Sequence, residues 1–128
     1  MQKLATLMVT ILFLTSCSTM GTLYNELPSA PSFTVEGKSY DQVYDAAFSV
    51  MSSKFAIESA DKNTGIIKAS NSMSAFSWGE IIGVSITPPK NASSYIVRVK
   101  SLKKAKTQIT GEDHTKDVMA NIKNKLGL

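Results

Sequence analysis

Few side chains in this 128-residue chain could do covalent or acid–base chemistry, because it contains one cysteine and one histidine. Cys17 follows an apolar run and two small residues, Thr15 and Ser16. His114 begins a predicted helix, where an imidazole is either a surface residue or an acid–base group that needs partners. The chain has no H-E-x-x-H, G-x-S-x-G, P-loop or Cys/His metal spacing. We therefore expect no catalytic residue, no metal site and no enzyme activity.

Residues 1–16 have the composition of a secretory signal peptide. Lys3 supplies the positive charge, and the apolar run from Leu4 to Leu14 precedes small residues. This run is too short for a membrane-spanning helix, which needs about 20 apolar residues. A cleaved leader is therefore favoured over a transmembrane anchor.

The residues Leu14-Thr15-Ser16-Cys17 resemble the lipobox of bacterial lipoproteins, which has an aliphatic residue and two small residues before a cysteine. The resemblance implies that the leader is removed and that Cys17 carries a covalent lipid, with no other cofactor. Several acyl chains make a stable membrane anchor, whereas a single chain holds a protein only marginally. Ser18 implies, by similarity to enterobacterial lipoproteins, a place on the outer membrane facing the periplasm. The alternative is a plain signal peptide followed by an ordinary thiol.

The chain after the leader has the composition of a short tether and one globular domain. Residues 17–32 contain glycine, two prolines and several hydroxyl residues without a clear period, which predicts a flexible tether. Residues 33–128 then form one domain. The net charge of +4 is too weak to indicate nucleic-acid binding. With Cys17 lipidated, no cysteine remains for a disulfide, so the domain depends on its apolar core.

The hydrophobic periodicity predicts the order β-α-β-β-β-β-α. A short strand at 33–35 precedes a helix that begins with a capping box, Ser39 and Gln42, and has a three- and four-residue apolar period. A hairpin at 56–69 comes next, then a strand at 75–87 with a bulge or twist near 79–83, and then a strand from Tyr95. A closing helix follows, with Asp113 as its cap and Gly127 as its stop. Strands grouped between helices favour an α+β domain, with an antiparallel sheet packed against two helices.

The region from Tyr40 to Ile67 resembles a helix-grip module of the kind found in BamC, a lipoprotein of the outer-membrane β-barrel assembly machine. The shared features are an aromatic-bearing helix, the turn Asp61-Lys62-Asn63-Thr64-Gly65 with Ile66 and Ile67, an aromatic strand and a closing helix. The resemblance implies a single helix-grip-like domain of a small envelope lipoprotein.

A run of basic residues is the clearest charge feature. Its members, any of which could contact phosphate or a partner, are Arg98, Lys100, Lys103, Lys104 and Lys106. On an alternating strand, Arg98 and Lys100 lie on the outer face, together with Lys104 and Lys106 if the alternation continues. Such a stripe could meet lipid phosphates, lipopolysaccharide or an acidic protein. The alternative is a solvated strand whose lysines prevent edge-to-edge pairing.

Two further features allow a structural and a functional interpretation. Trp78 shares its parity with Ile82 and so belongs to the core, unless a bulge turns it outward as an anchor for a partner. Asp41 and Asp45 lie one turn apart near the start of the first helix, where they either bind a cation or interact with the helix dipole.

These patterns predict a non-catalytic lipoprotein of the bacterial envelope that is held to the membrane by Cys17 and binds an envelope protein. The alternative is a lipid- or lipopolysaccharide-binding protein that uses an apolar groove and the basic strand. No nucleic-acid partner is expected.

Overall fold

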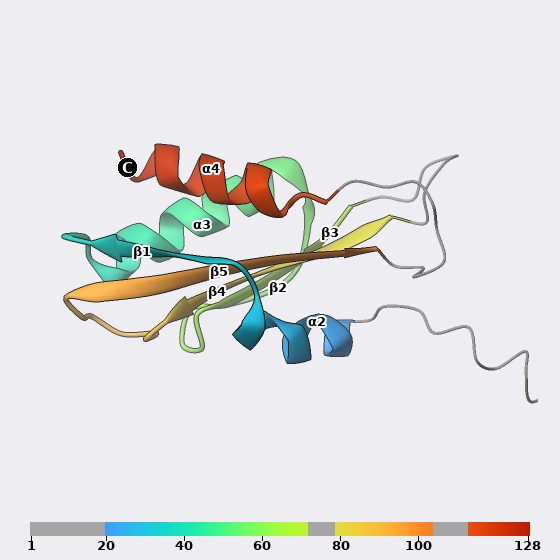
Figure 1. Ribbon diagram of the computed structural model, residues 1–128, viewed down its shortest axis with the longest axis horizontal. Helices are drawn as coiled ribbons and strands as arrows, with labels where there is room; N and C mark the ends of the chain where they lie inside the picture. The colour runs from blue at the N-terminus through green and yellow to red at the C-terminus, as the bar shows by residue number, and fades with distance from the viewer. Residues whose placement is uncertain (1–19, 72–78, 104–112) are drawn as a thin grey trace, which may run out of the picture.

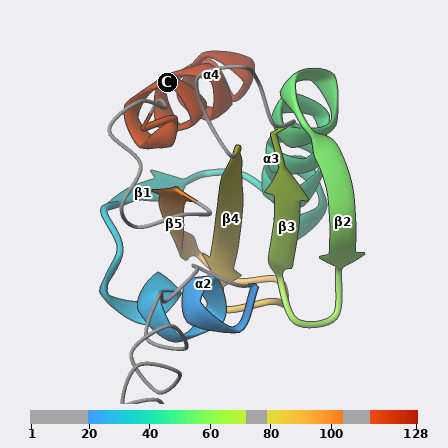
Figure 2. The same cartoon turned by 90° about the vertical axis from the view of Figure 1, so that its right-hand side faces the viewer.

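The computed structural model describes residues 20–71, 79–103 and 113–128 (Figure 1). Within these ranges five strands form one antiparallel sheet in the order β1-β5-β4-β3-β2, which Figure 2 shows from the side. The strands are β1 (Ser32–Glu36), β2 (Ala56–Asp61), β3 (Ile66–Ser70), β4 (Glu80–Thr87) and β5 (Ser94–Lys103). Helix α3 (Tyr40–Lys54) follows β1, and α4 (Thr115–Lys125) follows β5. The predicted α+β class and the order β-α-β-β-β-β-α are therefore confirmed.

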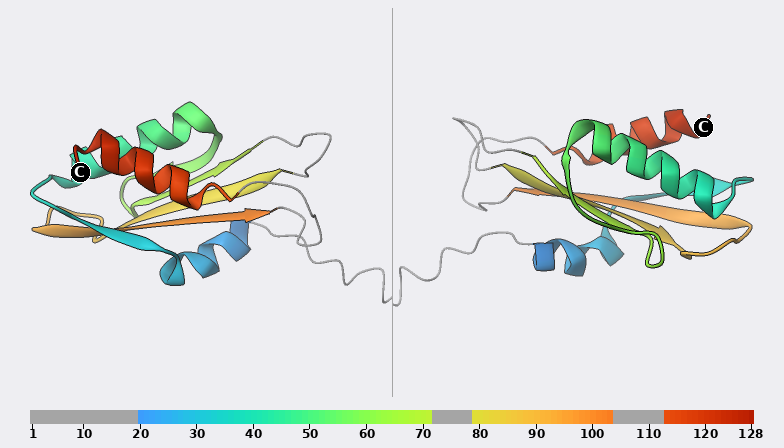
Figure 3. Two further views of the ribbon diagram at one scale, coloured as in Figure 1. Left: turned by 45° about the horizontal axis from the view of Figure 1, so that its top comes forward. Right: turned by 180° about the vertical axis from the view of Figure 1, so that it is seen from behind.

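The sheet has two differently covered faces. Helices α3 and α4 lie side by side on one of them, which we call the helix face (Figure 3). Helix α2 (Met20–Glu26) and the short 3₁₀ helix η1 (Leu27–Ser29) lie on the opposite face, which we call the outer face. None of the helices in the described part of the chain is long and apolar enough to cross a membrane.

The main core fills the space between the sheet and the helices of the helix face. Strand alternation directs Ile82, Val84 and Ile86 of β4 toward these helices, and the paired residues of β5 do the same. The buried residues that α3 contributes are Tyr40, Val43, Tyr44, Ala46, Ala47, Val50 and Met51. The predicted core parities of β4 and β5 are thus confirmed within the described residues.

The predicted capping box of α3 is present. The Gln42 amide donates to Ser39 Oγ at 3.2 Å, and the Ser39 amide donates to Gln42 Oε1 at 2.9 Å. Two otherwise unpaired amide groups of the first turn are satisfied in this way. This box fixes the start of α3 at Tyr40.

The chain before β1 differs from the expected flexible tether over residues 17–32. Met20–Glu26 is helical, and both Leu23 and Leu27 are buried. Leu23 of α2 and Leu27 of η1 both face the sheet. A seven-residue helix is marginal in water by itself, so its contact with the sheet must stabilise it.

Gly83 of β4 allows Leu23 to approach the sheet closely. Strand β4 itself has no bulge within 80–87. The pairing of β4 with β5 is continuous from Glu80 to Thr87, so of the bulge or twist expected near 79–83 the bulge is absent from this strand. A Cβ atom at Gly83 would lie 2.9 Å from Leu23 Cδ2. The glycine thus leaves room for the Leu23 side chain of α2 and does not interrupt the strand.

The ends of α4 agree with the prediction in part. Gly127 follows the last turn with φ 74°, as expected of a glycine stop. The residue at the cap position is His114 rather than Asp113, and its side chain makes no cap hydrogen bond. The Asp113 carboxylate instead accepts from the Thr115 amide at 2.9 Å. Although burial opposes it, this hydrogen bonding holds the pKa of Asp113 below its usual value.

Candidate functional site

A cleft on the outer face is the strongest candidate for a binding site. It has a volume of about 370 Å³ and lies between the α2–η1 segment and strands β3 to β5. Its lining residues are Tyr24, Leu27, Pro28, Thr64, Ile66, Ser85, Thr87 and Arg98. We call it the Arg98 cleft, because Arg98 is the charged residue in its lining.

The walls of the Arg98 cleft are held by contacts that can be traced to single residues. Leu23 and Leu27 fix one wall by packing on the sheet, and the Val99 amide donates to Pro31 O at 3.1 Å just after η1. The Tyr24 ring lies under Lys68 Nζ, which is 5.1 Å from the ring centroid. Both walls therefore exist before any ligand binds, as is usual for small-molecule sites.

The lining combines one cation with hydroxyl groups and apolar side chains. The Arg98 guanidinium offers several N–H donors, and Thr64, Ser85 and Thr87 carry hydroxyl groups. Guanidinium groups pair well with carboxylates and phosphates. Leu27 and Ile66 supply apolar surface beside them. The Arg98 cleft therefore suits an anionic group attached to a small apolar body.

The described residues of the predicted basic stripe lie on both faces of the sheet. Arg98 and Lys100 lie on the outer face, as predicted, because they alternate with the core residues Val97 and Val99. Lys103 has the parity of Val99 and therefore belongs to the helix-face side of β5. Lys100 is paired with Glu26 of α2 at 3.5 Å. Lys104 and Lys106, like Trp78 and Cys17, lie outside the described residues.

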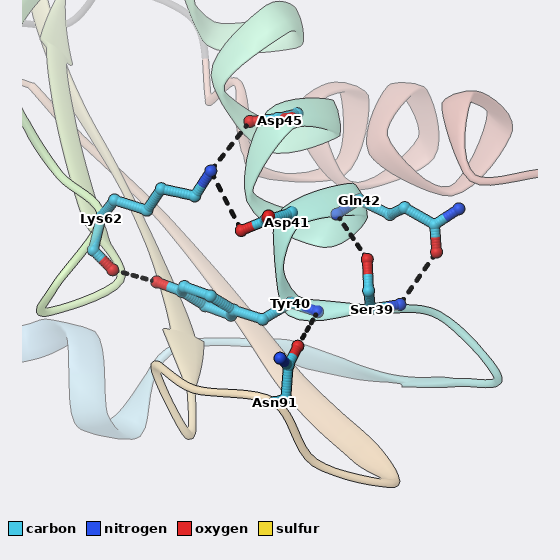
Figure 4. A network of polar contacts seen from close by, with 7 residues as sticks. All are labelled: Ser39, Tyr40, Asp41, Gln42, Asp45, Lys62 and Asn91. Atoms are coloured by element: carbon cyan, nitrogen blue, oxygen red, sulfur yellow. Dashed lines mark hydrogen bonds and ion pairs between the residues drawn. The ribbon is translucent and has the colours of Figure 1, made fainter.

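Asp41 and Asp45 hold a cation, but that cation is a lysine of the chain itself. Lys62 Nζ lies 3.1 Å from Asp41 Oδ1 and 3.6 Å from Asp45 Oδ1 (Figure 4). The hydrogen bond to Asp41 raises the pKa of Lys62. Within the described ranges, no group of three or more acidic, histidine or cysteine side chains is placed to hold a metal ion.

The same network ties the start of α3 to two turns. The Tyr40 hydroxyl donates to Lys62 O in the β2–β3 turn at 2.5 Å (Figure 4). The Tyr40 amide donates to Asn91 Oδ1 in the β4–β5 loop at 3.3 Å. Burial, followed by the nearby Tyr44, raises the pKa of Tyr40 above its usual 10.0. We interpret this network as structural, because its members bind one another.

His114 has an acidic neighbour that the sequence did not indicate. Its Nε2 atom lies 3.8 Å from Glu80 Oε2, and Glu80 is only 3% exposed. Asn71 Nδ2 also donates to Glu80 Oε2, at 3.1 Å. The His114 ring packs edge-on against Phe55, with 5.1 Å between the ring centroids. Because Glu80 is buried and His114 is largely buried, we interpret the pair as a link between β4 and the start of α4.

A second hollow lies between α3 and the end of α4. Its volume is about 480 Å³, and it is lined by Lys38, Gln42, Asp45, Ala46, Ser49, Lys125 and Leu126. Cations and an acid share this lining, and the apolar surface is limited to an alanine and a leucine. It is therefore a weaker candidate than the Arg98 cleft.

No model of a known protein family matches the chain, and no curated protein matches it significantly.

Proposed function

We propose that this chain is a non-catalytic lipoprotein of a bacterial envelope, held to the outer membrane by a lipid on Cys17, whose α+β domain binds another envelope component. The observation that carries the proposal is the Leu14–Cys17 box at the end of a short apolar leader. A lipid anchor of several acyl chains makes a stable membrane attachment, so the domain would remain at the bilayer surface.

The position of α2 supports a direct attachment. The helix begins at Met20, three residues after Cys17, and is packed on the sheet through Leu23. Three extended residues span at most about 11 Å. An anchored domain would therefore stay close to the headgroups.

Fractionation of cells that make the native chain or Cys17→Ser tests this function. The native protein should be found in the outer-membrane fraction, and the variant, which lacks the lipid, should be absent from that fraction. Crosslinking of the native protein in intact envelopes should then recover a stable protein neighbour. Equal outer-membrane association of both forms would contradict the anchor, and no crosslinked neighbour would contradict the interaction role.

A lipid- or lipopolysaccharide-binding protein is the second candidate, and the Arg98 cleft favours it. A guanidinium beside an apolar wall fits the combination of phosphate and acyl chain in such ligands. Replacing Lys103, Lys104 and Lys106 with glutamine should weaken lipopolysaccharide binding if the predicted stripe takes part. Of the described members of the run, Arg98 and Lys100 lie on the outer face and Lys103 does not, and Arg98 lines the cleft, so Arg98→Gln should have the larger effect. Unchanged binding in both variants would remove the basic strand from this candidate function.

A further inference from the structure

The outer face is the side of the domain from which an anchor at Cys17 would emerge. Helix α2 lies on this face, opposite to α3 and α4 (Figures 1 and 3). Leu23 is fully buried against the sheet, and Glu26 is paired with Lys100 of β5. Since α2 cannot swing away without losing these contacts, the three residues from Cys17 to Met20 limit the anchor to within about 11 Å of the first turn of α2.

The strands of the outer face carry three cations, Lys68, Arg98 and Lys100, and Glu36 of β1 lies on the same face by register. Within the described residues, Lys100 is the only one of the three cations with a carboxylate within 4 Å. Cations near an anionic bilayer are attracted to it, so Lys68 and Arg98 can contact anionic headgroups.

The outer face also exposes side chains that suit an interface between water and lipid. Tyr24 on α2 is 54% exposed, and Ile96 on β5 is 40% exposed. Tyrosine is enriched at the headgroup level of membranes, where its ring and its hydroxyl are both accommodated. Ile96 precedes Arg98 by two residues, so both side chains lie on the same face of β5.

We infer that the anchored domain lies with its outer face on the bilayer, and that the Arg98 cleft receives the phosphate of an anionic phospholipid. Tyr24 and Ile96 then contact the headgroup layer beside it. The inference rests on the proposed attachment through Cys17. It assigns the exposed sides of α3 and α4 to the surface that faces away from the membrane.

Site-specific quenching tests this orientation in the lipidated, full-length mature protein. Because the lipid occupies Cys17, a cysteine introduced by substitution is the only free thiol. One variant, Thr34→Cys, places a fluorophore on the outer face, and its matched control, Ser52→Cys, places it on the exposed side of α3. Both are reconstituted in vesicles of phosphatidylethanolamine and phosphatidylglycerol that contain a spin-labelled phospholipid. The inference predicts strong quenching at position 34 and weak quenching at position 52.

Equal quenching at the two positions, or stronger quenching at position 52, would overturn the orientation. A third variant, Lys103→Cys, places the fluorophore at the end of the sheet. Quenching at position 103 alone would mean that the domain stands on that end. This result would also overturn the inference. If the native protein carries no lipid by mass, the proposed function fails instead, and the orientation inference fails with it.

The role of Arg98 is tested by Arg98→Gln in the Thr34→Cys protein. Loss of one cation near an anionic surface should lower the ratio of domains that contact the bilayer to anchored domains that do not by about fivefold. The quenching at position 34 should fall accordingly. Lys90→Gln is the matched control, because Lys90 is exposed in the β4–β5 loop outside the cleft. If Arg98→Gln changes quenching no more than Lys90→Gln does, the cleft does not receive a lipid phosphate.

Discussion

Gly65 shows how a single residue connects the β2–β3 turn to the rest of the sheet. Its amide donates to Asp61 O at 2.9 Å, and its carbonyl accepts from the Ile86 amide at 2.9 Å. Its φ of 73° lies in the left-handed region, which glycine adopts without cost. A Cβ atom there would lie 2.5 Å from Ile86 O, a backbone atom that cannot move aside easily.

We therefore predict that Gly65→Ala lowers the free energy of unfolding far more than Gly37→Ala. Gly37 has φ 70° but nothing within 4 Å of a Cβ, so alanine there should cost only about 1 kcal/mol of backbone strain. Gly65→Ala should cost about 2 kcal/mol more, because the backbone contact adds to the strain. Urea unfolding of both variants measures the difference. Equal losses of unfolding free energy in the two variants would show that the backbone at Ile86 moves aside easily.

Tyr40 and Tyr44 make the free energy of unfolding depend on pH in the alkaline range. Burial raises the pKa of both hydroxyls above 10.0, so the fold favours their neutral forms. The resulting contribution to stability is complete below pH 10 and is lost as the pH rises through the folded-state pKa values. We predict that the doubly substituted chain, Tyr40→Phe with Tyr44→Phe, loses less stability than the wild type above about pH 10. Thermal unfolding across this range measures the slopes, and parallel slopes would contradict the prediction.

At the scale of single elements, α2 depends on one buried side chain. We predict that Leu23→Ala costs about 3 kcal/mol of stability or releases α2 locally, because Leu23 is fully buried and the helix has seven residues. Amide hydrogen exchange of residues 20–29 should speed up strongly in this variant.

Asn25→Ala is the matched control for α2, because Asn25 is an exposed residue of the same helix. It should leave the exchange rates of α2 nearly unchanged. Slow exchange in Leu23→Ala as well would mean that contacts other than Leu23 hold α2 to the sheet.

The elements also differ in how far the sequence predicts them. The capping box of Ser39 and Gln42 defines the start of α3, and strict alternation defines β5, because both patterns are local. Helix α2 was not predicted, because seven residues with a single leucine show no clear period and because the helix is stabilised by the packing of Leu23 against Gly83 on a distant strand.

The candidate sites were predicted less completely than the fold. The outer position of Arg98 and Lys100 follows from alternation. The Arg98 cleft itself is formed by α2, η1, the β2–β3 turn and three strands, so no stretch of sequence contains its pattern. Likewise, the contact of Glu80 with His114 was not predictable, because the fold brings these distant residues together.

Across the whole molecule, the two faces of the sheet differ. The helix face holds the main core. The outer face carries α2, the Arg98 cleft and the cations of β3 and β5. An anchor joined directly to α2 would give the domain a defined side toward the membrane, which a flexible tether would not.

The intact mass of the membrane-extracted protein shows whether the mature chain begins at a lipid-modified Cys17. We predict the mass of residues 17–128 plus a diacylglyceryl group and an acyl chain. Cys17→Ser should lack both the adduct and the cleavage before residue 17. A native protein with the unmodified mass of the whole chain, or one cut elsewhere without a lipid, would rule out the lipid anchor on Cys17.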